Sequence, residues 1–144
     1  MNAKRIINGT WGEVWLDDDK VGECKGLQAK IEIQKEDVKL CGQMAQDTKI
    51  TGWKGKGTLK LYKTSSRLAL KIKDEVLKNG KDIRFKIISK LADPDASGAE
   101  RVVIKNVSFD DLMLADWEAA KNGEVEAPFT FTDFDYLDMI QPEN

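Results

Sequence analysis

The side chains that most often carry out catalysis are scarce in this sequence of 144 residues. It has no histidine, which removes the commonest general base, the commonest metal ligand and every Ser-His or Cys-His pair. The residues left to form a general acid and base pair are Asp110, Asp111, Asp133, Asp135 and Asp138. Acids at turns and strand ends are more often solvated than catalytic, because catalysis needs a fixed geometry and a raised pKa. The sequence therefore predicts no catalytic residue and no enzyme.

Two segments partly match ligand-binding motifs. The segment 93–98 copies the opening of a calcium loop, but Ile104 stands where that loop needs a bidentate glutamate. Gly52 and Gly57 have the spacing of two P-loop glycines, but Thr58 stands where that motif needs lysine. The sequence predicts no metal site and no bound cofactor.

Cysteine usage and charge narrow the function classes further. Cys24 and Cys41 are sixteen residues apart, which fits no CxxC spacing, so we expect reduced, structural thiols. The net charge of -2 comes from 23 basic and 25 acidic residues in mixed order, which leaves no extended basic field for nucleic acid. The first residues lack the apolar core of a signal peptide, and no stretch is long enough to span a membrane. We expect a protein without a membrane anchor that stays in the cytoplasm after synthesis.

Two segments, 26–34 and 53–62, alternate apolar and polar side chains with the period of two that marks a half-buried strand. Their polar positions are Gln28, Lys30, Glu32 and Gln34 in the first segment and Lys54, Lys56, Thr58 and Lys60 in the second. Gly55 and Gly57 have the apolar parity of the second segment, which predicts close packing of another backbone against that face.

The connector between these strands, residues 35–52, is too long for a tight hairpin turn and too mixed in pattern for a confident strand. Connections of this length without their own structure usually carry function. The alternative is that the two strands run on into the connector, as the apolar positions Val38, Leu40 and Ile50 allow.

The other expected elements are mostly strands. The segments 12–16, 83–90 and 102–109 have strand patterns, and 112–117 continues the last of them after a bulge at 110–111. Asn122-Gly123 predicts a hairpin turn whose return strand is 125–134, with Pro128 at an edge or a bulge.

One helix is expected over residues 66–79, after N-cap oxygens at 64–66 and before Gly80 in a left-handed conformation. Its narrow apolar stripe, formed by Leu68, Ala69, Ile72 and Val76, could cover one open side of a sheet. The fold class is mainly β, an antiparallel sandwich or barrel of about seven strands with one flanking helix. We expect one domain over 1–144, with a loose tail at 141–144.

Five segments together carry a resemblance to a known family. They are 8–15 (NGTWGEVW), 26–32 (GLQAKIE), 35–38 (KEDV), 54–59 (KGKGTL) and 129–135 (FTFTDFD). In their order and spacing they resemble the XkdM-like family of phage tail tube proteins, across nearly the whole chain.

The resemblance implies a structural role in a virion tail or a tail-like particle that is assembled in the bacterial cytoplasm. Hexameric rings would stack into the inner tube of a contractile tail, similar in plan to the tube of type VI secretion systems. The implied partners are other copies of the chain and the sheath, tape measure, baseplate and tail terminator proteins. DNA would transit a phage tube without specific binding, and a tail-like bacteriocin would conduct ions instead.

The family also implies roles for parts of this chain. The connector would stack rings, through Lys35, Glu36, Asp37, Val38, Leu40, Met44, Gln46, Asp47 and Lys49. The polar face of the barrel wall would comprise Gln28, Lys30, Glu32, Gln34, Lys54, Lys56 and Lys60. It would line the lumen, where Glu32 and Glu36 could neutralise the lysines, or alternatively face outward to the sheath. An N-terminal arm, residues 1–11, would contact neighbours through Ile6, Ile7 and Trp11.

An alternative from another class is a monomeric small β-barrel that binds an oligonucleotide or a glycan. Trp11, Trp15, Trp53 and Lys54 would then form a stacking platform. Core or interface packing is the competing interpretation of those tryptophans.

Overall fold

The computed structural model describes residues 3–17, 19–62, 67–95, 98–111 and 113–140, and the structural statements below concern those ranges. The expected N-caps at 64–66 and the tail at 141–144 lie outside them, as do Asp18, Leu112 and residues 96–97. Two 3-10 turns, η1 (Ala3–Arg5) and η2 (Gly9–Trp11), come first. The strands are β1 (Gly12–Leu16), β2 (Asp19–Lys20), β3 (Cys24–Val38), β4 (Asp47–Tyr62), β5 (Phe85–Leu91), β6 (Glu100–Phe109), β7 (Glu124–Phe131) and β8 (Asp133–Asp138).

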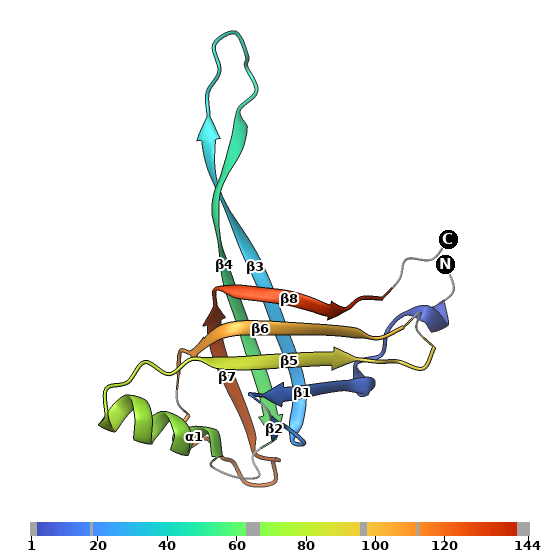
Figure 1. The fold of residues 1–144 in the computed structure, drawn as a ribbon, viewed down its shortest axis with the longest axis vertical. Coiled ribbons are helices and arrows are strands. Elements are labelled where there is room, and N and C mark those ends of the chain that lie inside the picture. Colours follow the sequence, from blue (N-terminus) through green and yellow to red (C-terminus); the bar gives the residue numbers. More distant parts are fainter. Residues whose placement is uncertain (1–2, 18, 63–66, 96–97, 112, 141–144) are drawn as a thin grey trace.

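All strand pairings are antiparallel, in the order β2-β1-β5-β6-β7-β4-β3, with β8 also paired to β6. Strands β1, β2, β5, β6 and β8 make one layer, and β3, β4 and β7 make the other. Figure 1 shows the strands of the two layers crossing, with β6 and β7 connecting them at a corner. The predicted antiparallel β-sandwich is confirmed.

The core lies between the two layers and is built from one parity of each strand, except that β6 contributes Ile104 and Val107, which have opposite parity on the two sides of Asn106. Its largest fully buried side chains are Phe129, Leu59, Ile87 and Val107. Burying a side chain of this size stabilises the fold by about 1.5–3 kcal/mol. The ring of Phe129 packs edge-on to Phe109, with 6.0 Å between centroids, so aromatic contacts join β6 to β7.

Gly55 and Gly57 of β4 leave room for the rings of Phe131 and Phe129. The sequence predicted close packing against this face. A Cβ atom on Gly55 would lie 2.6 Å from the Phe131 ring. A Cβ atom on Gly57 would meet the Phe129 ring and lie 2.5 Å from the Gln28 carbonyl oxygen. The close neighbour at Gly55 is a ring rather than a backbone.

The predicted connector 35–52 is wrong in its bounds, and the alternative, that strands β3 and β4 run on into it, is confirmed. Their pairing continues through Lys35↔Ile50 to Val38↔Asp47 and leaves residues 39–46 as the loop. The register shifts between Gln34 and Lys35, opposite Gly52 and Ile50. The extra residue, Thr51, reverses the parity of β4, and nearly all side chains beyond it are exposed, so neither strand keeps the apolar alternation of a half-buried strand there.

The expected helix consists of α1 (Arg67–Ile72), which continues into a π-helical segment, η3 (Lys73–Lys78). Gly80 follows with a φ of 64°, and its amide donates to the Val76 carbonyl at 3.0 Å, as predicted for the helix end. Leu70 and Leu77 are 54% and 66% exposed, and Figure 1 shows the helix at the margin of the sandwich. It covers less of the sheet than the sequence suggested. None of the described helices is long and apolar enough to cross a membrane.

The predicted hairpin at Asn122-Gly123 is wrong. Neither residue has a positive φ, and residues 113–117 form no strand. Strand β7 pairs with β4 over eight positions and with β6 over two. The connection from β6 therefore passes from one layer to the other instead of turning tightly.

The predicted strand 125–134 is interrupted at Thr132, where the chain changes layers. Asn106 lies opposite this corner with a φ of 58°, and its side-chain amide donates to the Thr132 hydroxyl at 2.6 Å. β6 pairs with β8 before Asn106 and with β7 after it. The predicted edge or bulge at Pro128 is wrong, because β7 lies between β6 and β4 and its ladder with β4 runs through Pro128↔Thr58 without a register shift. Proline is tolerated there because β6 has already ended, and the Pro128 carbonyl accepts from the Asp110 amide at 2.9 Å.

Substituting Asn106 with valine should destabilise the corner, because a β-branched residue resists the left-handed conformation at a cost of about 1–2 kcal/mol. Asn106→Gly keeps the conformation and loses only the hydrogen bond, so we expect a smaller loss. Urea unfolding of both variants measures the difference. Equal stabilities for Asn106→Val and the wild type would contradict this role.

Candidate functional site

The acidic residues considered for catalysis are not assembled into a site. Asp133 and Asp135 lie on β8 opposite Lys105 and Val103, and both are exposed. Asp110 and Asp111 follow β6 at the layer corner and are also exposed. No group of three or more histidine, cysteine or acidic residues in the described ranges is arranged to hold a metal. The remaining candidates for a functional site are therefore exposed surfaces that could bind another chain.

The polar residues predicted for the barrel wall share one face of the β3–β4 pair, which we call the wall face. The register places Lys30 opposite Lys56, Glu32 opposite Lys54, and Gln34 opposite Gly52. Lys60 lies on the same face, opposite Gly26 on β3 and Glu126 on β7.

The wall face carries more lysine than acid, and its charges are partly paired. Lys56 Nζ lies 3.6 Å from Glu32 Oε2, although the register sets Glu32 opposite Lys54. Glu36 lies farther along, opposite Lys49. These pairs are exposed, so each contributes about 0–1 kcal/mol and sets the local charge pattern more than the stability.

Beyond the bulge, the paired strands project from the sandwich as a hairpin extension, residues 35–50 (Figure 1). Six of the predicted stacking residues are paired within it: Lys35, Glu36, Asp37, Val38, Asp47 and Lys49. The other three, Leu40, Met44 and Gln46, lie in the tip loop, residues 39–46. All nine are exposed except Val38, which is partly buried.

Strand β3 is an edge strand. It has 15 residues, and within the described ranges it pairs only with β4. A groove of about 450 Å³ follows it, and its walls are the side chains of β3 and the inner face of the other layer. The lining includes Leu27, Ala29, Ile31, Ile104, Phe134 and Tyr136. A long unpaired strand edge beside an apolar groove is able to pair with another chain.

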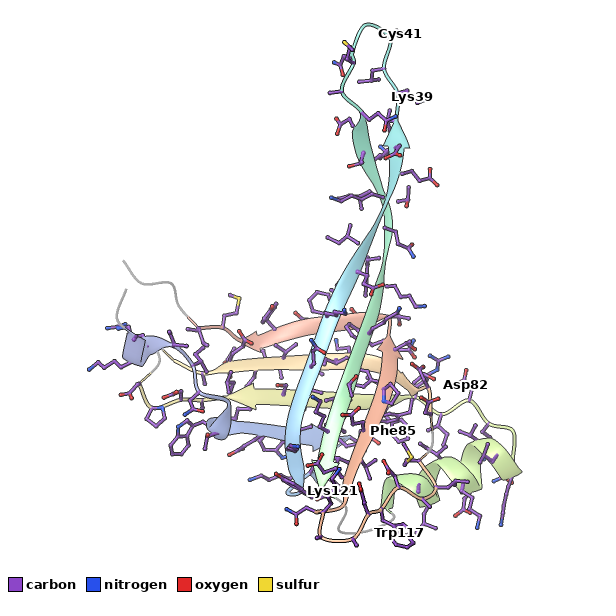
Figure 2. The ribbon with its side chains drawn as sticks, turned by 180° about the vertical axis from the view of Figure 1, so that it is seen from behind. Lys39, Cys41, Asp82, Phe85, Trp117 and Lys121 are labelled. Carbon is purple, nitrogen blue, oxygen red and sulfur yellow. The ribbon has the colours of Figure 1, made fainter. Side chains whose placement is uncertain are left out.

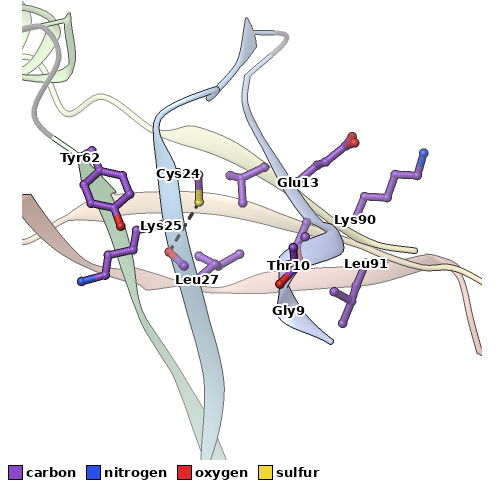
Figure 3. Close-up of a pocket in the computed structure, with 13 residues that line it drawn as sticks. Gly9, Thr10, Glu13, Cys24, Lys25, Leu27, Tyr62, Lys90 and Leu91 are labelled. Atoms are coloured by element: carbon purple, nitrogen blue, oxygen red, sulfur yellow. Dashed lines mark hydrogen bonds between the residues drawn. The ribbon is translucent and has the colours of Figure 1, made fainter. Parts of the chain in front are cut away.

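A second pocket of about 480 Å³ continues the groove, since Leu27, Ser89 and Leu91 line both. Figure 3 shows it between the start of β3, with Cys24 and Lys25, and the segment Gly9 to Glu13. The Cys24 Sγ donates to the Gly26 carbonyl at 3.7 Å. Burial raises the pKa of the Cys24 thiol, and the charge of Glu23 adds to the effect, while the Gly26 hydrogen bond opposes it.

The two cysteines should therefore differ in reactivity. At about pH 8, the raised pKa of Cys24 lowers its thiolate fraction, and Cys41 is exposed in the tip loop. We expect iodoacetamide to modify Cys41 first, as read by peptide mass spectrometry. Urea-unfolded protein, the control, should lose the difference, and equal rates in the folded protein would contradict the prediction.

The predicted N-terminal contact residues lie on a segment tied to the sandwich. The Asn8 amide donates to Asp93 Oδ2 at 2.8 Å, and the Asp95 amide donates to the other oxygen at 2.9 Å. Ile6 and Trp11 are 61% and 50% exposed, and Ile7 is partly buried. Two apolar side chains are thus available to another chain.

The tryptophans of the alternative hypothesis do not share a platform. Trp53 has the core parity of β4 and packs against Phe131 and Phe134, with centroids 6.3 and 6.1 Å away. Trp15 alternates with the buried residues of β1, so it lies on the outer face of the other layer. Lys54 lies on the wall face, opposite in parity to Trp53.

Sequence reasoning missed three surfaces. They are the groove, the unpaired edge of β3, and the exposed apolar residues of the segment 113–121, which precedes β7. Strand patterns mark which side chains are apolar, but they do not show which strand has a free edge or which half of a sheet is left uncovered.

Comparison with known proteins adds independent evidence. The family model described as "Phage tail tube protein" matches residues 1–138. The phage-like element PBSX protein XkdM of Bacillus subtilis (strain 168) is 34% identical over 142 residues, which cover 97% of this chain and 96% of that protein.

Solved structures share the fold at low sequence identity. A chain from the PVC sheath-tube complex of an extracellular contractile injection system in the extended state has a TM-score of 0.73, with 10% identity and 95% of both chains covered. A chain from the sheath/tube terminator of that system has a TM-score of 0.76, with 11% identity, over 95% of this chain and all of that one.

Proposed function

This chain belongs to the phage tail tube protein family, and from that premise we propose that its copies form hexameric rings that stack into the inner tube of a contractile tail. The family membership gives it a structural role in a tail or tail-like particle. The observation that carries the ring proposal is the unpaired 15-residue edge of β3 beside an apolar groove. We propose that it has no catalytic role.

Within a ring, the edge of β3 pairs with or packs against the next copy, so that the β3–β4–β7 layers join into one barrel. Such a head-to-tail contact is heterologous, and its rotation closes the ring. Closure removes the exposed strand edge and covers the groove. The exposed Ile6 and Trp11 of the N-terminal segment add further contacts between copies.

The wall face then lines the lumen as the polar side of the barrel. Its residues are Gln28, Lys30, Glu32, Gln34, Lys54, Lys56 and Lys60. Glutamates such as Glu32 and Glu126 interrupt the row of lysines and lower the positive charge that transiting DNA would meet.

The hairpin extension, Lys35 to Ile50, reaches the adjacent ring and stacks it. The projection of the extension beyond the sandwich supports this role, as does the exposure of its stacking residues. We propose that the tube binds sheath, baseplate, terminator and tape measure proteins, and that it assembles in the host cytoplasm. The solved relatives come from sheath-tube and terminator assemblies, which is consistent with those partners.

Size-exclusion chromatography and negative-stain microscopy of the purified protein test the proposal. Rings or tubes are expected, in amounts that rise with protein concentration. A strict monomer at high concentration that retains an oligonucleotide in low salt would contradict the tube and favour the monomeric binding module.

A further inference from the structure

Two groups of exposed apolar side chains lie at opposite ends of the molecule. Figure 2 places Cys41 and Lys39 at the tip of the hairpin and Trp117 and Lys121 at the far end, beyond the sandwich. These ends are separated along the longest axis of the molecule (Figure 1). A chain with complementary patches at its two ends assembles head to tail along that axis.

The tip loop presents apolar groups without cover. Met44 is fully exposed at 103%, and Leu40 is 49% exposed. Gly42 has a φ of 82°, and the Gln43 amide donates to the Leu40 carbonyl at 3.3 Å, so the loop has a defined turn. A shaped loop with exposed Met and Leu side chains is suited to binding a surface.

The opposite end carries the most exposed aromatic side chain in the described ranges. Trp117 is 85% exposed and Leu114 is 82% exposed, and both belong to the connector segment 113–121. A turn shapes this segment, since the Lys121 amide donates to the Glu118 carbonyl at 3.3 Å. Exposed tryptophan is the residue that most often dominates the energy of a protein interface.

The two ends also differ in charge. Residues 39–46 contain one basic residue, Lys39, and no acid. Residues 110–121 are acidic overall, with Asp110, Asp111, Asp116 and Glu118 against one basic residue, Lys121, whose Nζ lies 3.0 Å from Glu118 Oε2. A basic tip and an acidic receiving segment attract each other, which favours this pairing over tip against tip.

We propose that the tip loop of one copy docks on the connector segment 113–121 of a copy in the next ring, with Met44 and Leu40 against Trp117 and Leu114. The inference rests on the proposed stacking role and names the surface that receives the hairpin. Lys39 then lies beside Asp116 and Glu118 of the neighbour. The molecule that covers the exposed Trp117 side chain is a second copy of the chain.

Thiol cross-linking tests this contact with the native Cys41 as one partner. In a Cys24→Ser background, Ala115→Cys or Ala119→Cys places a second thiol in the exposed receiving segment and keeps Leu114 and Trp117, and Asp135→Cys on β8 is the matched control. Assembled protein is treated with a short bis-maleimide and examined by denaturing electrophoresis and peptide mass spectrometry. Within one copy the two positions lie at opposite ends, so a cross-link between them reports two copies.

A ladder of species joined through Cys41 and position 115 or 119 is expected, at about tenfold the yield of the position 135 control, because docking raises the effective concentration of the thiols. If tubes form normally but both positions give no more cross-linked product than the control, this contact is wrong and the proposal of a stacked tube still stands. Protein that stays monomeric at every concentration would overturn the stacked tube and this contact together.

Discussion

Gly57→Val is expected to abolish the native fold or lower its stability severely. The first added carbon would meet the Phe129 ring and lie 2.5 Å from the Gln28 carbonyl oxygen, and valine adds two more carbons. Phe129 is 1% exposed, so the ring has no free volume into which it can move. Overpacking a filled core costs about 1–3 kcal/mol, and often more where backbone blocks the added atoms, against a typical stability of about 5–15 kcal/mol. Circular dichroism and urea unfolding measure the loss.

Gly26→Val is the matched control for this substitution. Gly26 also lies in a strand, but a Cβ atom there meets nothing within 4 Å. Valine favours strand conformation, so this variant should be as stable as the wild type or slightly more stable. A Gly57→Val protein with an unchanged urea midpoint would show that β4 does not pack as described.

Replacing the tip loop, residues 39–46, with Asn-Gly should separate folding from stacking. The two-residue turn suits the antiparallel strands that end at Val38 and Asp47, so the ladder can close without the tip. The core is remote from the tip, and the urea midpoint should not change. Tubes should disappear while rings remain, because the inter-ring contact is lost and the edge of β3 is intact. Negative-stain microscopy and sedimentation measure both species.

A same-length variant controls for changes in the loop alone. Gln43→Ser with Ala45→Ser keeps Leu40, Gly42 and Met44, so it should form tubes of normal length. If the Asn-Gly variant also formed tubes of normal length, the hairpin would have no part in stacking.

Much of the fold could be predicted because its strands have one apolar parity. Strands β1, β5 and β6 lie close to their expected ranges, and Gly80 ends the helix as its conformational freedom suggested. The wall residues fall on one face because the period of two continues unbroken from Gly26 to Gln34.

The remaining features depend on contacts between distant segments. A bulge beside Gln34 reverses the parity, so the continuation of β3 and β4 could not be distinguished from a loop. Asn122-Gly123 matches the local preference of a tight hairpin, but β7 finds its main partner in β4, and tertiary pairing overrides the turn signal. The corner at Asn106 and Thr132 depends on a hydrogen bond between residues 26 positions apart.

The surfaces were the least predictable part of the chain. Trp53 and Trp15 look equivalent in the sequence, yet the structure places them on different layers. The sequence around Trp117 has no alternation of apolar and polar residues that would predict its exposure. The fold shows that this side chain is 85% exposed. The predicted roles in stacking, wall and N-terminal contacts stay proposals.

Cryo-electron microscopy of the tube assembled from the purified protein tests the central claim most directly. The account predicts hexameric rings whose β3 edges meet the neighbouring copies, with each hairpin extension crossing into the next ring. A tube in which β3 remains unpaired and uncovered and the hairpin stays within its own ring would contradict it.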